Sequence, residues 1–188
     1  MIPSYARRDD PDINTVWTWF EFQIALIGES RGSVLGSLRL ASGVVGEALL
    51  PHEERFVGAT RGEVEEFFDA QRGQLELLTM FELLSTTEAI LRIEFSARVA
   101  ARKKDGLSRR FRKLHKVNRD KIRLDDDILG AMKDEGIPAN VIADFRGALR
   151  LRHWLAHGRH WHPKLGRGYA PSDVFDISRA LIDSIPPS

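Results

Sequence analysis

The sequence contains no cysteine. This absence excludes disulfide bonds and thiolate metal sites, and it fits a reducing compartment. The opening stretch, MIPSYARRDDPD, lacks the apolar core of a signal peptide. No run of about 18 apolar residues occurs, so no segment is expected to cross a membrane as a helix. We therefore expect a soluble, cytoplasmic protein of one domain, or of one domain with an appendage, in 188 residues.

Each half of the chain has few charges of one sign: the first half has few cations, and the second half has few carboxylates. Residues 1–97 contain 8 arginines against 16 acidic residues, which gives a net charge of −8. Residues 98–188 contain 20 lysines and arginines against 11 acidic residues, which gives a net charge of +9. This asymmetry indicates a polyanionic partner for the second half. It would also arise if the halves attracted each other or a second subunit.

Strand-like alternation and internal repeats are absent, and apolar residues recur with the period of an α-helix. Gly28 and Gly32 are expected to end the first helix, and Thr60 with Glu63 forms a capping box that opens the third. The pattern predicts an all-α bundle of roughly five to seven helices. The helices are expected over 13–27, 33–50, from 60 onward, 74–104, twice within 108–135, 138–157 and 171–185. Residues 1–60 would form accessory helices, within the same compact domain or as an appendage.

Aromatic residues are almost missing from the most cationic segment, residues 98–123. It contains 12 lysines and arginines, and its one aromatic residue is Phe111. Cations at this density can neutralise phosphates and release their counterions, whereas base stacking needs aromatic side chains. The segment predicts either a surface that binds nucleic-acid phosphates or a solvated helix face. The candidate binding residues are Arg102, Lys103, Arg109, Arg110, Arg112 and Lys113.

One carboxylate, Glu88, falls on the apolar stripe of the predicted helix over 74–104. A buried carboxylate is costly unless it is paired, so Glu88 is a candidate for orienting a cation or a histidine on a facing helix. Two local alternatives remain open. Ser85 and Glu88 have the spacing of a capping box, at which a helix could restart. Arg92 lies one turn further on, where it could form a salt bridge with Glu88.

Carboxylates are absent from residues 149–163, LRLRHWLAHGRHWHP, which contain four histidines and three arginines. His153 and His157 are four positions apart and share a helix face, which is a suitable start for a zinc site. His160 and His162 could supply further nitrogens. Four neighbouring cations would repel a divalent ion, and they are Arg150, Arg152, Arg159 and Lys164.

The same residues could instead carry out metal-free chemistry on a phosphodiester. A guanidinium can hold a phosphate through two hydrogen bonds and stabilise developing charge. An imidazole can move the proton of a 2′-hydroxyl or of a leaving oxygen near neutral pH. Arginine and histidine without carboxylates are what attack on an RNA phosphodiester needs. A third alternative is that these residues cap the helix and coat the surface.

Residues 152–157, Arg-His-Trp-Leu-Ala-His, match the R-x4-H motif of the HEPN superfamily, including a polar residue directly after the arginine. The chain resembles this superfamily in context as well. The motif ends a late helix, Gly158 follows it, and one more helix follows the glycine. The stretch STTEAILRIEFSARV, residues 85–99, is similar to the long helix that precedes the motif helix. The resemblance covers about residues 75–185.

The resemblance implies that residues 61–188 form a HEPN-like bundle, commonly dimeric, with a composite cleft lined by both subunits. It implies a metal-independent endoribonuclease without a cofactor, of the kind found among toxins and antiphage effectors. Arg152 would bind the scissile phosphate, and His157 would act as general base or acid. The products would be a 2′,3′-cyclic phosphate and a 5′-hydroxyl.

Other residues would have supporting roles in such a site. His153 would orient or contact RNA, Glu88 would support the site, and Arg159, His160 and Lys164 would join the cationic segment in binding RNA. Other HEPN proteins are catalytically silent RNA-binding or protein-interaction modules, and this alternative stays open. An antitoxin or a defence protein could be a further partner, and no membrane partner is expected.

Overall fold

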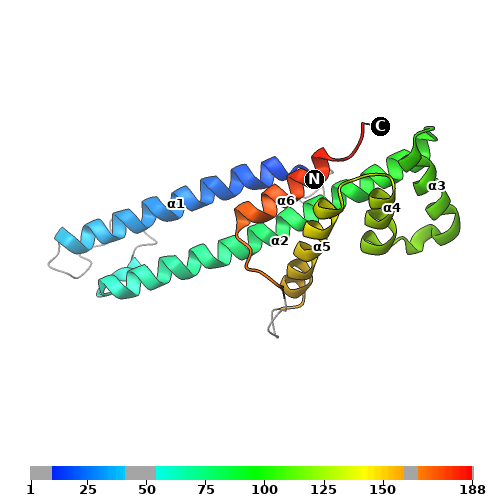
Figure 1. Ribbon diagram of the computed structural model, residues 1–188. Helices are drawn as coiled ribbons and strands as arrows, with labels where there is room; N and C mark the ends of the chain where they lie inside the picture. Colours follow the sequence, from blue (N-terminus) through cyan, green and yellow to red (C-terminus); the bar gives the residue numbers. More distant parts are fainter. Residues whose placement is uncertain (1–9, 41–53, 159–164, 188) are drawn as a thin grey trace. The chain divides into compact units, whose positions relative to one another are not determined.

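The computed structural model describes residues 10–40, 54–158 and 165–187. Within these ranges the fold has six α-helices and no strand, so the all-α prediction is confirmed. The helices are α1 (Ile13–Leu40), α2 (Arg61–Ala101), α3 (Gly106–Asn118), α4 (Leu129–Asp134), α5 (Ala139–Ala156) and α6 (Pro171–Asp183) (Figure 1). None of the helices in these ranges has both the length and the apolar character needed to span a membrane.

The chain forms two compact units. One unit contains the described residues of Met1–Val16 and Met80–Ser188, and the other is Trp17–Thr79 without its undescribed part. Both α1 and α2 pass from one unit into the other, so each division falls inside a helix. These units differ from the division into residues 1–60 and 61–188 that the sequence suggested. The functional meaning of that division stays a prediction.

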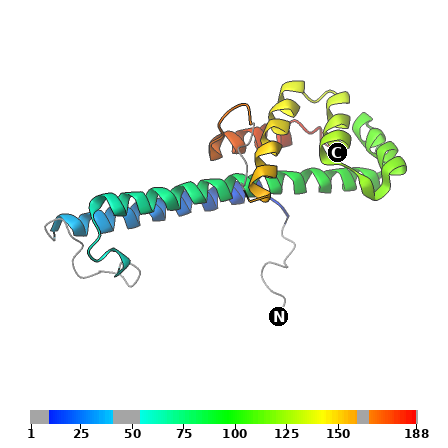
Figure 2. The ribbon, with the colours of Figure 1, turned by 90° about the horizontal axis from the view of Figure 1, so that it is seen from below.

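The unit of residues 17–79 is a helical hairpin, in which α1 and the start of α2 lie side by side (Figures 1 and 2). Its buried core consists of Val34, Leu38, Phe56, Val64 and Phe68. The prediction that Gly28 and Gly32 end the first helix is wrong, because α1 continues through both to Leu40. Burial of the face that carries Val34 and Leu38 outweighs the low helix propensity of glycine. The rest of the predicted helix over 33–50 lies outside the described residues.

The capping box at the start of α2 is confirmed. The Thr60 backbone N–H donates to Glu63 Oε2 at 2.7 Å, and the Glu63 N–H donates to Thr60 Oγ1 at 3.3 Å. The hydrogen bonds that the Thr60 backbone N–H and the Thr60 hydroxyl donate to the carboxylate lower the pKa of Glu63. The two helices predicted from residue 60 and over 74–104 are one helix, because α2 runs unbroken from Arg61 to Ala101. For the same reason the predicted restart at Ser85 is wrong.

The other unit has a core between the second half of α2 and helices α3 to α6. Leu83 and Leu84 of α2, Phe145 of α5 and Leu181 of α6 are all completely buried. Helix α5 crosses α2, and α6 packs against α5 (Figures 1 and 2). The predicted stop at Gly158 is confirmed, since this glycine follows α5 with a φ of 77°, where a side chain would be strained.

Arg98 is the exception within the predicted cationic surface, because its side chain is completely buried. Its guanidinium bonds to Glu94 of the same helix, to Asp105 Oδ1 at 3.1 Å and to the backbone carbonyl of Pro186. Asp105 also caps α3 by accepting the Ser108 backbone N–H at 2.8 Å. Hydrogen bonding from Ser108 lowers the pKa of the Asp105 carboxyl. Arg98 therefore joins α2, the start of α3 and the C-terminal segment.

Candidate functional site

One face of α2 meets the end of α5 and holds the arginine of the motif. Phe81, Ser85, Glu88 and Arg92 recur at spacings of four, three and four residues, so they line one side of the helix. Arg152 of α5 lies against this row. Its Nη2 is 3.2 Å from Glu88 Oε2, its Nε donates to Ser85 Oγ at 3.4 Å, and its guanidinium carbon is 5.9 Å from the centre of the Phe81 ring.

Glu88 binds two arginines at once. Its Oε2 faces Arg152, and its Oε1 is 2.8 Å from Arg92 Nη2. The Glu88 side chain is 17% exposed, whereas Arg152 and Arg92 are 34% and 46% exposed. The prediction that Glu88 orients a cation on a facing helix is confirmed in geometry, and the local salt bridge to Arg92 forms as well. Whether Glu88 supports a reaction stays a prediction.

The charge of this cluster differs from what residues 149–163 indicate on their own. That stretch has no carboxylate, but the fold brings Glu88 to it from α2. One carboxylate between two guanidiniums leaves a net charge of +1. Both guanidiniums are partly exposed, so the cluster can still attract an anion. A phosphate is therefore not the only counter-charge available to Arg152, but it would neutralise the charge that remains on the cluster.

The two histidines of the motif form a pair at the C-terminal end of α5. The ring centres of His153 and His157 are 4.3 Å apart, and both side chains are exposed. The His157 backbone N–H donates to the His153 carbonyl at 3.2 Å, which closes the last turn of the helix. Five positions separate Arg152 from His157, so their side chains leave the helix about 140° apart. Arg152 is directed at α2, while the imidazoles face solvent.

The predicted RNA-binding residues outside the motif differ in their surroundings. Arg102, Lys103, Arg109 and Lys113 are exposed. Arg110 is half-buried and pairs with Asp134 at 2.9 Å, and Arg112 is also half-buried. Three further predicted residues, Arg159, His160 and Lys164, lie outside the described residues.

The described part of the chain contains no group of three histidine or acidic side chains that could hold a metal ion. His153 and His157 would supply two nitrogens of the metal site considered above. The other two candidate ligands, His160 and His162, lie outside the described ranges.

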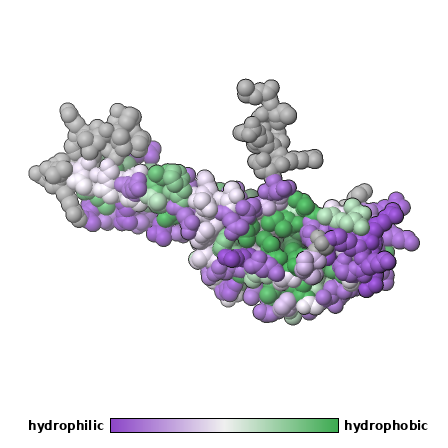
Figure 3. Space-filling view, turned by 90° about the horizontal axis from the view of Figure 1, so that it is seen from above, coloured by the Kyte–Doolittle hydropathy of each residue, from purple (hydrophilic) through white to green (hydrophobic). Residues whose placement is uncertain are grey.

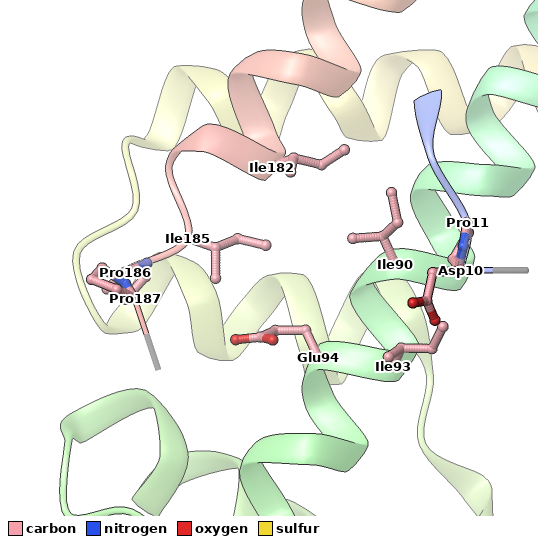
Figure 4. A pocket seen from close by; sticks show the side chains of 9 residues that line it. All are labelled: Asp10, Pro11, Ile90, Ile93, Glu94, Ile182, Ile185, Pro186 and Pro187. Carbon is pink, nitrogen blue, oxygen red and sulfur yellow. The ribbon is translucent and has the colours of Figure 1, made fainter. Parts of the chain in front are cut away.

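A separate hollow of about 510 Å³ lies between α2 and the end of α6. Ile90 and Ile93 face Ile182 and Ile185 across it, and Glu94 lies at its edge (Figure 4). Figure 3 shows an apolar area on this unit. The hollow contains none of the predicted site residues. Its walls are mainly aliphatic, and two carboxylates line it, those of Asp10 and Glu94, of which Glu94 is bound to Arg98.

Sequence reasoning missed two parts of the arginine site. The sequence indicated Arg92 only as a local salt-bridge partner of Glu88, and Ser85 only as a possible helix cap. The spacing Ser85-x2-Glu88-x3-Arg92 could have placed all three on one face of a continuous helix. That α5 lies on this face could not be read from the spacing, because it depends on how α5 packs across α2.

Comparison with known proteins yields no relative that could identify the chain. No family model matches it, and neither any curated protein nor any solved structure is significantly similar to it.

Proposed function

We propose that the chain is a metal-independent endoribonuclease of the HEPN type, acting as a toxin or an antiphage effector. The observation that carries the proposal is the position of Arg152. It lies in the last turns of α5, which also carry two exposed imidazoles, and Glu88 and Ser85 of α2 hold it from one side. The R-x4-H resemblance supplies the reaction class, and the side chains supply the required chemistry.

In the proposed reaction Arg152 binds the scissile phosphate. A histidine acting as base takes the proton of the 2′-hydroxyl, and the 2′-oxygen attacks the phosphorus. The bond from phosphorus to the 5′-oxygen breaks, and an acid gives the leaving oxygen a proton. The products are a 2′,3′-cyclic phosphate and a 5′-hydroxyl. His157 is one of the two proton-transfer groups, and His157 of a second copy in a composite cleft would supply the other.

Glu88 is a positioning residue in this proposal. It occupies Nη2 of Arg152, and Ser85 accepts from Nε. This arrangement leaves Nη1 with no hydrogen bond to any described residue, so it is available to a phosphate oxygen. A guanidinium that is fixed before the substrate binds costs less reorganisation when charge develops in the transition state.

The experiment is cleavage of a mixed RNA pool in EDTA by the wild type, Arg152→Ala and His157→Ala. We expect both variants to lose about 10²-fold or more, as is usual for a phosphate-binding or proton-transfer group. Arg150→Ala and His115→Ala are matched controls, because they remove an exposed arginine and an exposed histidine outside the motif. Equal cleavage by the wild type and both motif variants would disprove the proposal.

A second candidate is a catalytically silent HEPN-like module that binds RNA or a protein partner. The observation that favours it is the exposed cationic surface of α3, which could bind phosphates without any reaction. Salt-sensitive RNA binding without turnover over a broad panel of RNAs would support this candidate over the nuclease.

A further inference from the structure

The outer face of α3 is a cationic surface whose orientation the fold fixes. Leu107, Ser108 and Phe111 are buried, and the Phe111 ring centre lies 4.8 Å from that of Phe95 on α2. These contacts hold one side of α3 against the core. Arg109 and Lys113, which are four positions apart, lie on the opposite side and are exposed.

Most of the cations on and around this face have no counter-ion among the described side chains. Eight are exposed without an ion pair, and they are Arg102, Lys103, Lys104, Arg109, Lys113, Lys116, Arg119 and Lys121. Three nearby carboxylates already have partners, since Asp105 binds Arg98, Asp134 binds Arg110 and Asp126 binds Arg123. A surface with this excess of one charge favours a polyanion.

The same face has no aromatic side chain on which a base could stack. Phe111, the only Phe, Tyr or Trp of α3, is 1% exposed and faces the core. Stacking on aromatic rings is the usual way to hold single-stranded bases, whereas lysines and arginines bind the phosphates. The face can therefore read the backbone of a nucleic acid, but it has little means to read its sequence.

This face lies away from the arginine site along α2. Ten residues separate Glu88 from Arg98, which is a distance of about 15 Å along a helix axis, and α3 begins beyond Ala101. Figures 1 and 2 both show α3 at the opposite end of this unit from the C-terminal end of α5. Figure 3 shows a strongly hydrophilic surface at the α3 end.

We infer that the α3 face is a second RNA-binding site, which holds the phosphates of the same RNA strand that reaches Arg152 and His157. This inference rests on the proposed function, because it takes that site as the place of cleavage. A helical strand advances about 3.4 Å per nucleotide, so an RNA needs more than about five nucleotides to reach from one site to the other. The expected substrates are therefore RNAs long enough to reach both sites, and α3 should bind them without a sequence preference.

The test is binding of fluorescent 2′-O-methyl RNAs of 4, 8, 12 and 30 nucleotides, measured by anisotropy. These probes lack the 2′-hydroxyl, so they bind without being cleaved. For the wild type we expect affinity to rise about 100-fold between 4 and 12 nucleotides, because one strand then occupies both sites. For the triple variant Arg109→Gln/Lys113→Gln/Lys116→Gln we expect this rise to shrink to a few-fold.

The salt dependence of binding gives a second measurement on the same triple variant. The slope of log affinity against log salt should fall by about 2 for the 30-nucleotide RNA, because three phosphate contacts are lost.

The matched control is Arg61→Gln/Arg72→Gln/Arg179→Gln. It removes the same charge from three exposed arginines that already have acidic partners on their own helices. An equal loss in both triple variants, or an unchanged length dependence in the α3 variant, would overturn the inference. Loss of the length dependence in the α3 variant alone, in a protein that cleaves no RNA, would refute the nuclease and retain α3 as an RNA-binding surface. The bridging itself is refuted if Arg152→Ala leaves the 100-fold rise intact.

Discussion

Two arginine–carboxylate clusters lie on the same helix, α2, and they differ in what surrounds them. Arg98 has no exposed side-chain surface, and its guanidinium bonds to two carboxylates and a backbone carbonyl. Arg152 is 34% exposed and shares a single carboxylate with Arg92. The first arginine has its bonding capacity taken up inside the fold. The second keeps donors and charge for a ligand, so the comparison separates a stabilising arginine from a binding one.

The strongest test of this comparison is Arg98→Ala. Glu94 and Asp105 would lose their buried partner, and the α3 cap and the C-terminal segment would lose a common anchor. Loss of one member of a buried ion pair costs about 3–5 kcal/mol. We expect about 3 kcal/mol, because both carboxylates are partly exposed and would regain water. Urea unfolding would measure the change. Arg92→Ala on the same helix should cost less than about 1 kcal/mol, as exposed pairs do, and equal losses would contradict the distinction.

Glu88→Gln tests the exposed cluster without changing its shape. The variant would leave Arg92 and Arg152 without a counter-charge, so the net charge of the cluster would rise from +1 to +2. We expect tighter binding of 2′-O-methyl RNA, because a phosphate meets more charge. If the proposed reaction takes place, kcat should fall about tenfold because Arg152 is no longer held in position.

The control for Glu88→Gln is Glu82→Gln, which removes an exposed carboxylate from the same helix. Single-turnover cleavage and anisotropy would separate the two effects on kcat and on binding. Weaker RNA binding by Glu88→Gln would contradict the charge argument, and an unchanged kcat would show that Glu88 does not position Arg152.

Asp105→Ala tests the link between Arg98 and the cationic surface. Removing an N-cap side chain costs about 1 kcal/mol, so α3 should open more readily at its first turn. Hydrogen exchange of the α3 amides would report this change, and the 30-nucleotide RNA should bind more weakly because the cationic face is less ordered. Asp134→Ala, which removes an exposed partner of Arg110, is the comparison variant and should leave the exchange at the first turn of α3 unchanged.

The smallest expected effect is on acid stability. Hydrogen bonds from Ser108 hold the pKa of Asp105 below its usual value, and those from Thr60 do the same for the pKa of Glu63. A carboxyl whose pKa is lower in the folded state stabilises the fold at pH values above its unfolded pKa. This contribution is lost as the pH falls through the folded pKa. Acid titration followed by circular dichroism should therefore show a weaker acid dependence in Glu63→Ala. An unchanged titration curve would show that the cap contributes nothing.

Sequence patterns predicted the helices well where local signals were strong. The capping box at Thr60, the turn at Gly158 and the last helix all follow from residues close to one another in the sequence. The patterns failed where tertiary packing outweighed propensity, as in the continuation of α1 through Gly28 and Gly32. They also failed for Arg98, which sequence alone placed in a segment expected either to bind phosphates or to be a solvated helix face.

Part of the candidate site could be predicted from the sequence. The apolar stripe that contains Glu88 made this residue a candidate for orienting a cation or a histidine on a facing helix, and Arg152 is such a cation. The salt bridge between Arg92 and Glu88 was predicted only as a local contact, not as part of the site that holds Arg152. Arg92 belongs to this site because α5 crosses α2 at this face, and no pattern of spacing encodes where two helices cross.

Three glycines of α1 have a further consequence. Gly28, Gly32 and Gly36 are exposed, and a Cβ atom at any of them would meet nothing within 4 Å. Each costs a helix about 1 kcal/mol relative to alanine, so this stretch of α1 is held mainly by the contacts of its buried face. Its amide hydrogens should therefore exchange with solvent sooner than those of the fully packed helices, and a protease should cleave this stretch of α1 sooner than it cleaves those helices.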